Sequence, residues 1–293
     1  MKKVLVLLFL VVTLSQSFSQ DNKKDYDFEF LPAGLNFLPL KAGIDEPRMG
    51  ILYYSANTNM KVDIGNSFDI VGFNFKNSGT RITVGADFFA YAFVTSYLKY
   101  RLQIDAIDGY FGGNVAYSKE LGNGRIVTRF RYIHCSSHMV DGHWDALKWQ
   151  WIDSRPPTAY GNNYMELVLA NELNHTKNYL RYYGGLSYST GMTTKNKPLK
   201  RTIYKAGFEY AYENLFGKVF DKDENIFVAV NFDFKGIPKY VVNQNYLMGI
   251  KFGGWQGKGI VFYISYYNGG DVFNQYFEER VSRFGLGVMF DFL

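Results

Sequence analysis

Large apolar side chains recur at every second position along most of this chain, with small or polar side chains between them. Successive side chains of a β-strand point to opposite faces, so the pattern predicts strands with one apolar and one polar face. Residues 282–293 show it most clearly. The apolar members of that stretch are Phe284, Leu286, Val288, Phe290 and Phe292, and between them stand Arg283, Gly285, Gly287, Met289 and Asp291.

About twelve strand-like runs follow one another from residue 48 to the end, and no shift in composition marks a second domain. We expect them at 48–56, 67–75, 80–91, 106–119, 124–138, 162–174, 178–190, 201–213, 225–234, 243–253, 259–267 and 282–293. Such a succession of short strands predicts an all-β fold.

The aromatic content narrows the choice among all-β folds. The chain has 24 Tyr, 26 Phe and 4 Trp. A soluble β-sandwich would also alternate, but it would not need one face to be so uniformly aromatic, whereas membrane barrels use aromatic residues at both interfaces. After the first twenty residues, no run has the length and apolarity of a membrane-spanning helix. We therefore predict a closed antiparallel transmembrane β-barrel of about twelve strands.

The lengths of the connections predict how the barrel is oriented. Outer-membrane barrels have short periplasmic turns and longer external loops, and an even strand count leaves both termini on the periplasmic side. The short connections then all fall on that side, although 214–224 is longer than this rule favours. Short turns are expected at 76–79, 121–124, 174–177 and 254–258, and longer loops at 140–161, 191–200 and 268–281.

The N-terminal part of the chain lacks the strand pattern. Residues 1–19 have the basic start, the apolar run and the small-x-small end of a secretory signal peptide. Residues 20–46 form a lead-in segment in which Pro32 and Pro39 disfavour a strand, and 47–293 form the barrel. We predict a protein of the outer membrane of a Gram-negative bacterium, inserted as a monomer by the outer-membrane assembly machinery.

Charge argues against a nucleic-acid partner. The formal charge of +5 falls to about +3 without the two signal-peptide lysines, and no basic stripe stands out. Charged residues of both signs instead occupy the polar faces of the strands. We expect them to form ion pairs that fill a narrow lumen, in preference to a path for substrates. This set is Arg129, Arg131, Glu166, Glu172, Arg181, Lys205, Glu209, Glu213, Asp233 and Asp291.

The densest polar cluster of the sequence lies at 128–141, where one predicted strand ends. Three of the four histidines fall in or next to it, and His134, Ser136 and His138 share one strand face. A histidine and a serine two residues apart on one face have the minimum arrangement for a base-activated hydroxyl nucleophile. The alternative is a polar strand end without chemistry.

Three segments together resemble a known family. They are 31–50 (LPAGLNFLPLKAGIDEPRMG), 132–142 (YIHCSSHMVDG) and 274–292 (NQYFEERVSRFGLGVMFDF). They resemble the bacterial outer-membrane family catalogued as domain of unknown function 1207. The resemblance spans nearly the whole mature chain. It implies an outer-membrane barrel and no established activity.

A second, local resemblance implies an activity. Outer-membrane phospholipase A and the lipid A 3-O-deacylase carry His-x-Ser on a strand near the external rim, completed by an Asn or Glu from a neighbouring strand. His134 and Ser136 match that spacing, although the phospholipase follows its serine with Asn-Gly and this chain has Ser137-His138. The resemblance implies that His134 is the general base and Ser136 the nucleophile of a lipid acyl hydrolase. Our candidate for the third residue is Asn163, with Asp141 and Glu166 as alternatives.

Strand phase predicts which way the cluster points. If Arg129 and Arg131 face the lumen, then His134, Ser136 and His138 face lipid at the external rim, where a lipid acyl hydrolase needs its nucleophile. A bulge near Cys135 would instead turn the cluster inward.

No metal site is predicted. On a regular strand His134 and His138 are about 13 Å apart, too far to share one ion. No cofactor is expected, although a requirement for a divalent cation stays open. His143 in the long loop and His175 in a turn are expected to be ordinary surface residues.

Outer-membrane lipid is the expected partner. Residues His138 and Asp141, together with the loop tryptophans Trp144, Trp149 and Trp151, are candidate lipid-binding residues. We expect the tryptophans to anchor the loop at the membrane interface; the alternative is a loop folded over the rim. Two functional classes stay open: a lipid acyl hydrolase, and a non-catalytic barrel that acts as scaffold, binding surface or narrow pore.

Overall fold

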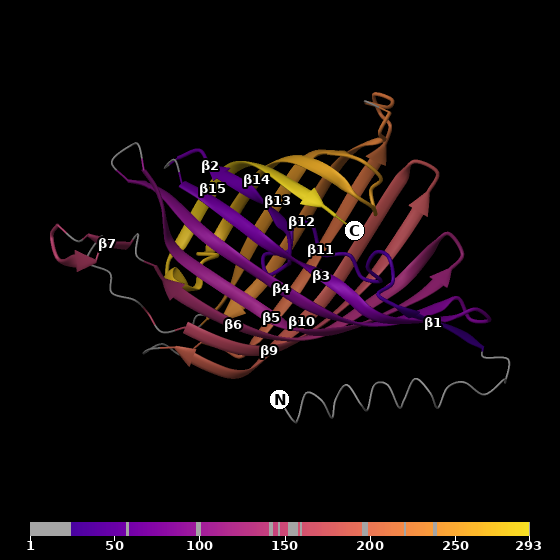
Figure 1. Ribbon diagram of the computed structural model, residues 1–293, viewed down its shortest axis with the longest axis horizontal. Coiled ribbons are helices and arrows are strands. Elements are labelled where there is room, and N and C mark those ends of the chain that lie inside the picture. Colours follow the sequence, from indigo (N-terminus) through magenta and orange to yellow (C-terminus); the bar gives the residue numbers. More distant parts are fainter. Residues whose placement is uncertain are drawn as a thin grey trace.

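A closed antiparallel β-barrel makes up most of the molecule, seen in Figure 1 with its long axis horizontal. The structure is a computed structural model. It describes residues 25–56, 59–97, 101–140, 143–145, 147–151, 158, 160–194, 199–219, 221–236 and 239–292. The predicted signal peptide, residues 1–19, lies outside the described residues. Within those ranges, no helix is long and apolar enough to cross a membrane.

Twelve strands form the wall, and each pairs with its neighbour in antiparallel register. The ring closes because β3 pairs with both β2 and β4 while β2 pairs with β15. The wall strands are β2 (Met49–Tyr54), β3 (Asn59–Phe75), β4 (Thr80–Tyr97), β5 (Arg101–Leu121), β6 (Gly124–Met139), β9 (Tyr160–His175), β10 (Asn178–Thr194), β11 (Thr202–Glu213), β12 (Glu224–Gly236), β13 (Tyr240–Phe252), β14 (Gly259–Gly270) and β15 (Arg280–Asp291).

These strands confirm the predicted barrel and match the twelve predicted runs one for one. The main difference is length, because β3, β4 and β5 extend about five to eight residues beyond the predicted ends at one side. The added part of β3 was hard to recognise because Lys61 and Asp63 stand in it. Both side chains point inward, where they form an ion pair with each other.

The two ends of the barrel differ. We call the end with the tight turns, such as 76–79 and 176–177, the turn end, and the end with the connections 140–159 and 271–279 the loop end. In Figure 1 the small hairpin β7 (Trp144–Asp145) and β8 (Gln150–Trp151) marks the loop end on the left, and β1 (Tyr26–Phe30) marks the turn end on the right.

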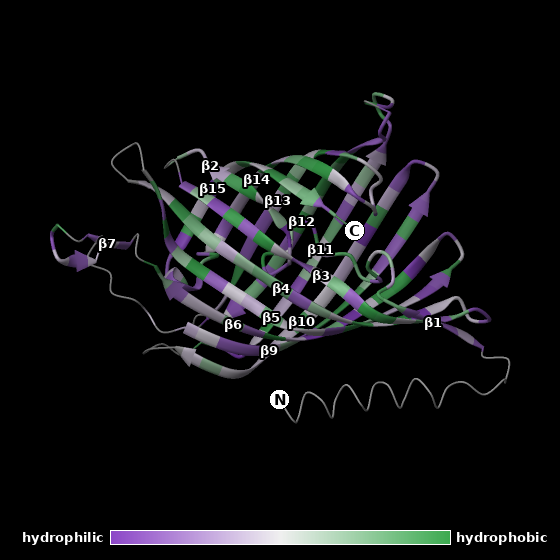
Figure 2. Ribbon diagram, viewed as in Figure 1, coloured by the Kyte–Doolittle hydropathy of each residue, from purple (hydrophilic) through white to green (hydrophobic). Residues whose placement is uncertain are grey.

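Burial follows the predicted alternation. On β15, Phe284, Leu286 and Phe290 are exposed on the outside, whereas Met289 is buried inside. Figure 2 shows the same alternation of hydrophobic and hydrophilic residues along the strands of the wall. An apolar outer wall around a polar interior is the arrangement expected of a barrel that spans a membrane.

The lead-in segment has a role that the sequence did not indicate. After β1, which pairs with the last residues of β3, residues 31–48 run into the lumen before β2 begins. Asn36, Leu40 and Ala42 are fully buried there. The barrel wall holds the segment through its backbone: Arg181 donates to the Leu38 carbonyl (2.8 Å) and Asn245 to the Ala42 carbonyl (2.8 Å). We call residues 31–48 the plug.

Ion pairs fill the lumen, as predicted, and the plug supplies one of the acids. Glu46 accepts a bidentate pair of hydrogen bonds from the Arg129 guanidinium (2.6 and 2.9 Å). Glu166 in turn binds Arg129, Arg131 and Lys205 at 2.7–3.0 Å. Burial alone would raise the pKa of Glu46, but the guanidinium groups of Arg129 and Arg131 outweigh it and lower the pKa to about 2.

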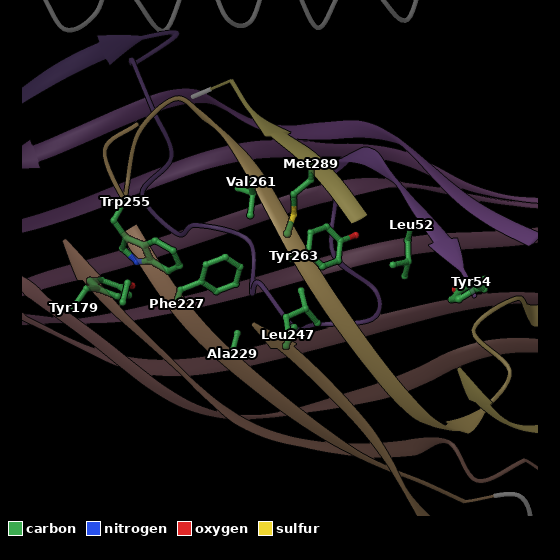
Figure 3. Packing of buried hydrophobic residues seen from close by; sticks show 12 residues of the cluster. Leu52, Tyr54, Tyr179, Phe227, Ala229, Leu247, Trp255, Val261, Tyr263 and Met289 are labelled. Atoms are coloured by element: carbon green, nitrogen blue, oxygen red, sulfur yellow. The ribbon is translucent and has the colours of Figure 1, made fainter. Parts of the chain in front are cut away.

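Apolar clusters fill the rest of the interior. Near the turn end, Trp255 packs its ring against Tyr179 (5.7 Å) and Phe227 (5.3 Å), as Figure 3 shows. At the loop end, the connection between β14 and β15 folds inward through the short helix η3 (Asn274–Tyr276), and Phe273 and Phe277 are buried. The lumen is therefore filled from both ends.

Candidate functional site

Strand β6 carries the predicted site residues, and its register is regular to the end. Its pairing with β5 runs without a shift from Gly124 to Met139. Ile133, Cys135 and Ser137 are buried inside, whereas His134 and Ser136 are half-buried and His138 is exposed on the outside. The bulge alternative at Cys135 is therefore wrong, and the cluster faces outward.

Asn163 on the neighbouring strand β9 lies directly opposite His134. The His134 Nδ1 atom is 2.6 Å from the Asn163 Oδ1 atom, a short hydrogen bond. An amide oxygen only accepts, so Nδ1 carries the proton and Nε2 is left with a free lone pair. This is the tautomer that a general base needs.

Two further side chains hold this pair, and the sequence did not single out either of them. A register shift in β10 between Ser189 and Gly191 lets Thr190 donate from its hydroxyl to the Asn163 carbonyl (3.1 Å). Phe111 on β5 packs its ring against the His134 imidazole, with the ring centres 4.8 Å apart. His134 is thus held by Asn163 on one side and by Phe111 on the other.

Ser136 completes the cluster without a hydrogen bond to His134. The two residues occupy adjacent positions on the same face, with Cα atoms about 6.7 Å apart. The structure contains no hydrogen bond between these two described side chains, and neither is bonded to loop backbone. Contact between the free Nε2 and the serine hydroxyl requires a side-chain rotation, a common difference between free enzymes and their substrate complexes.

Glu166 and Asp141 were the alternative candidates for the residue that orients His134. Glu166 points into the lumen, where it pairs with two arginines and Lys205, so that alternative is wrong. Asp141 lies outside the described residues. Asn163 is the candidate that the fold brings to His134.

The remaining histidines divide between surface and interior. His175 is exposed, as predicted, although it is the last residue of β9 and not part of the turn that follows. The prediction for His143 is wrong: it is 3% exposed, and its ring lies against Tyr276 of η3 and Trp151. Loop packing, which leaves no local pattern, buries it. Within the described residues, no group of three or more His, Cys, Asp or Glu side chains could hold a metal ion.

The loop tryptophans are grouped. Trp144 and Trp151 face each other across the β7–β8 hairpin, with ring centres 5.0 Å apart, and Trp149 at the tip is 81% exposed. The hairpin extends beyond the loop end of the barrel in Figure 1. A contact of Trp149 with the membrane interface stays a prediction.

The height of the site on the wall follows from the strand register. Tyr132 and Tyr188 lie on either side of Met165 in one row across β6, β9 and β10, and all three side chains are exposed. Outward-facing tyrosines are typical of the membrane interface. The pair His134–Asn163 lies one step beyond this row toward the loop end.

A closed barrel of twelve wall strands with an apolar outer surface defines the class of protein: a β-barrel of the outer-membrane type. No protein-family model matches the sequence, so membership of the domain-of-unknown-function family stays a prediction. No curated protein is significantly similar to it.

Among solved structures, one titled "Bacterial polysaccharide outer membrane secretin" is similar over 85% of this chain and 100% of its own. Its sequence identity is 9% and its TM-score 0.33, a likeness too low to carry an argument. The assignment to the class therefore rests on the geometry of the barrel described above.

Proposed function

We propose that this barrel is a lipid acyl hydrolase of the outer membrane, acting on lipids in the leaflet at its loop end. The observation that carries the proposal is the His134–Asn163 hydrogen bond on the outer wall, beside Ser136 and one step from the row of Tyr132 and Tyr188. Ester groups of membrane lipids lie at that interface, so the nucleophile is where its substrate would be.

These residues and water account for every bond formed and broken in the reaction. Ser136 Oγ attacks the ester carbonyl while its proton passes to His134 Nε2. Collapse of the tetrahedral intermediate breaks the ester C–O bond, and Nε2 returns the proton to the leaving alcohol. Water, deprotonated by Nε2, then attacks the acyl-serine, and the proton returns to Ser136 as the fatty acid leaves. Asn163 holds the imidazole through Nδ1.

A neutral amide suits this position better than a carboxylate. The site is on the lipid-facing wall, where an unpaired charge is costly. Asn163 orients the ring and selects the tautomer without bringing a charge there. The cost is weaker support for the imidazolium that forms during the reaction, since no negative charge faces it.

The filled lumen argues against the pore alternative. Two cavities inside the barrel, near Tyr164 and near Lys41, measure only about 60 Å³ each. A larger space of about 580 Å³ is confined to the loop end, where Asn59, Gln103 and Arg283 line it. The plug and the loop connection together occupy the central path. The remaining non-catalytic function is that of a scaffold or binding surface. The following experiment distinguishes this function from lipid hydrolysis.

The test is release of fatty acid from phospholipid and from lipid A in mixed micelles, with and without Ca²⁺. We expect the Ser136→Ala substitution to abolish release and His134→Ala to lower kcat about 10²–10⁴-fold. Both variants should keep heat-modifiable gel mobility, since the residues lie on the barrel surface. Ser282→Ala, an exposed hydroxyl on the distant strand β15, is the matched control and should keep full activity. Wild-type release no higher than that of Ser136→Ala would leave the non-catalytic reading.

A further inference from the structure

Glycines occupy the wall positions on both sides of Ser136. Gly109 on β5 pairs with it in one direction and Gly161 on β9 in the other. Both are on the outer face, where neighbouring positions carry large apolar side chains such as Phe111, Met165 and Leu167. The serine hydroxyl is therefore open on two sides.

The backbone does not require glycine at either position. Neither residue has a positive φ. A Cβ on Gly109 would come no closer than 4.0 Å to another atom, the Ser136 Oγ, and one on Gly161 no closer than 4.0 Å, to the Cys135 carbonyl. Gly112, by contrast, would place a Cβ 2.0 Å from the Tyr132 carbonyl oxygen. Packing explains Gly112 but not Gly109 or Gly161.

A strand glycine without a packing reason is unusual, because glycine weakens strands. One recurrent reason is a ligand that approaches the backbone closely. On β5, the outward-facing neighbours of Gly109 are Ile107 on one side and Phe111 on the other. Ile107 lies opposite His138 on β6, and Phe111 lies opposite His134. The position that a Cβ on Gly109 would take, between these two outward-facing neighbours, is 4.0 Å from the Ser136 Oγ. The side chains on either side of this position are apolar, and it opens to lipid.

We propose that Gly109 and Gly161 form a notch in the outer wall that binds an acyl ester. The ester carbonyl lies at Ser136, and the first methylenes of the acyl chain lie between Ile107 and Phe111. The inference rests on the proposed function and deepens it. It assigns the substrate as a lipid with a long acyl chain, entering sideways from the membrane and not through the lumen. It also gives Phe111 two contacts, one with His134 and one with the acyl chain.

Valine substitutions test the notch. We expect Gly109→Val and Gly161→Val to lower kcat/KM for a long-chain phospholipid by about tenfold or more, since added methyl groups would occupy the acyl position. An acetyl ester, which has no chain to seat, should lose less. Gly113→Val is the matched control: it lies on the same outer face of β5, and its added Cβ would meet nothing closer than 3.6 Å. An unchanged kcat/KM in both notch variants, with an active wild type, would overturn the notch.

A binding readout separates this inference from the hydrolase itself. A phospholipid with a photoreactive diazirine near its acyl carbonyl is cross-linked to the Ser136→Ala protein in detergent micelles. We expect labelled peptides from β5, β6 and β9 around residues 107–111, 134–138 and 161–163, and loss of that label with Gly109→Val. Labelling spread evenly over the wall would contradict the notch even if hydrolysis is observed. Specific labelling without hydrolysis would retain the notch and reject the enzyme.

Discussion

For single residues, the candidate site depends on side chains from four neighbouring strands, β5, β6, β9 and β10. Strand phase predicted that His134 and Ser136 share the outer face, because a regular strand fixes which side each residue faces. The contribution of Thr190 could not be predicted, since it depends on the register shift in β10. A bulge leaves no reliable mark in a sequence.

The substitution Asn163→Ala tests whether Asn163 orients the His134 imidazole. It removes the acceptor that fixes the proton on Nδ1, so we expect kcat to fall with little change in KM, because the amide does not contact substrate. Loss of a hydrogen bond to a group that becomes charged is worth about 1.5–3 kcal/mol, or roughly 10- to 150-fold in rate.

Asn163→Asp provides the comparison for that experiment. It restores an acceptor, and we expect it to recover part of the lost rate while raising the pH at which activity is half-maximal, since a carboxylate favours the imidazolium. Steady-state kinetics between pH 5 and 9 would show this. Equal rates for the alanine, aspartate and wild-type proteins would remove Asn163 from the site.

At the scale of elements, the twelve wall strands were predictable because each repeats a period of two, whereas the plug was not. Residues 31–48 have no period, and prolines indicate only that the segment is not a strand. One feature of the sequence did indicate that another segment supplies acids to the lumen. Arg129 and Arg131 are on a strand that has no inward-facing acidic residue of its own. Their partners, Glu46 and Glu166, come from the plug and from β9.

The charge of Glu46 should make the plug sensitive to acid. Its pKa is lowered to about 2 in the folded protein from an ordinary 4.5. A carboxyl with a lowered folded pKa contributes stability that is present above its unfolded pKa and is lost as the pH falls through the folded value. We therefore expect full stability down to about pH 4.5 and a progressive loss between pH 4.5 and 2.

The temperature at which heat-modifiable gel mobility is lost, measured from pH 7 to pH 2, checks this. The Glu46→Gln variant should be less stable at pH 7 by about 3–5 kcal/mol, because Arg129, Arg131 and Lys205 are then left with Glu166 as their one shared carboxylate partner in this ion-pair cluster. It should also show a smaller further change on acidification. A wild type and a variant with parallel pH curves would mean that Glu46 does not account for the acid response.

At the scale of the whole molecule, barrel and plug form a closed body whose chemistry is expected on its outer wall. We expect the purified protein to give no stepwise conductance in planar bilayers, since the ion pairs of Glu46 and the buried rings of Phe273 and Phe277 fill the lumen. Replacement of both phenylalanines by alanine should still give no open channel, because the plug remains. Steps of a size typical of water-filled porins in the wild type would show that the plug leaves the lumen.

The six-residue strand β2 has a consequence for how the protein is made. It is the shortest of the wall strands, against eighteen residues for β4, and it follows the plug directly in the chain. The ring is complete only when β15, the last strand to be synthesised, pairs with β2. After that pairing, residues 31–48 can enter or leave the lumen only through an end of the barrel, because a closed ring of hydrogen bonds leaves no route through the wall. The connectivity therefore makes this seam the last to form, and it forms at the shortest strand of the wall.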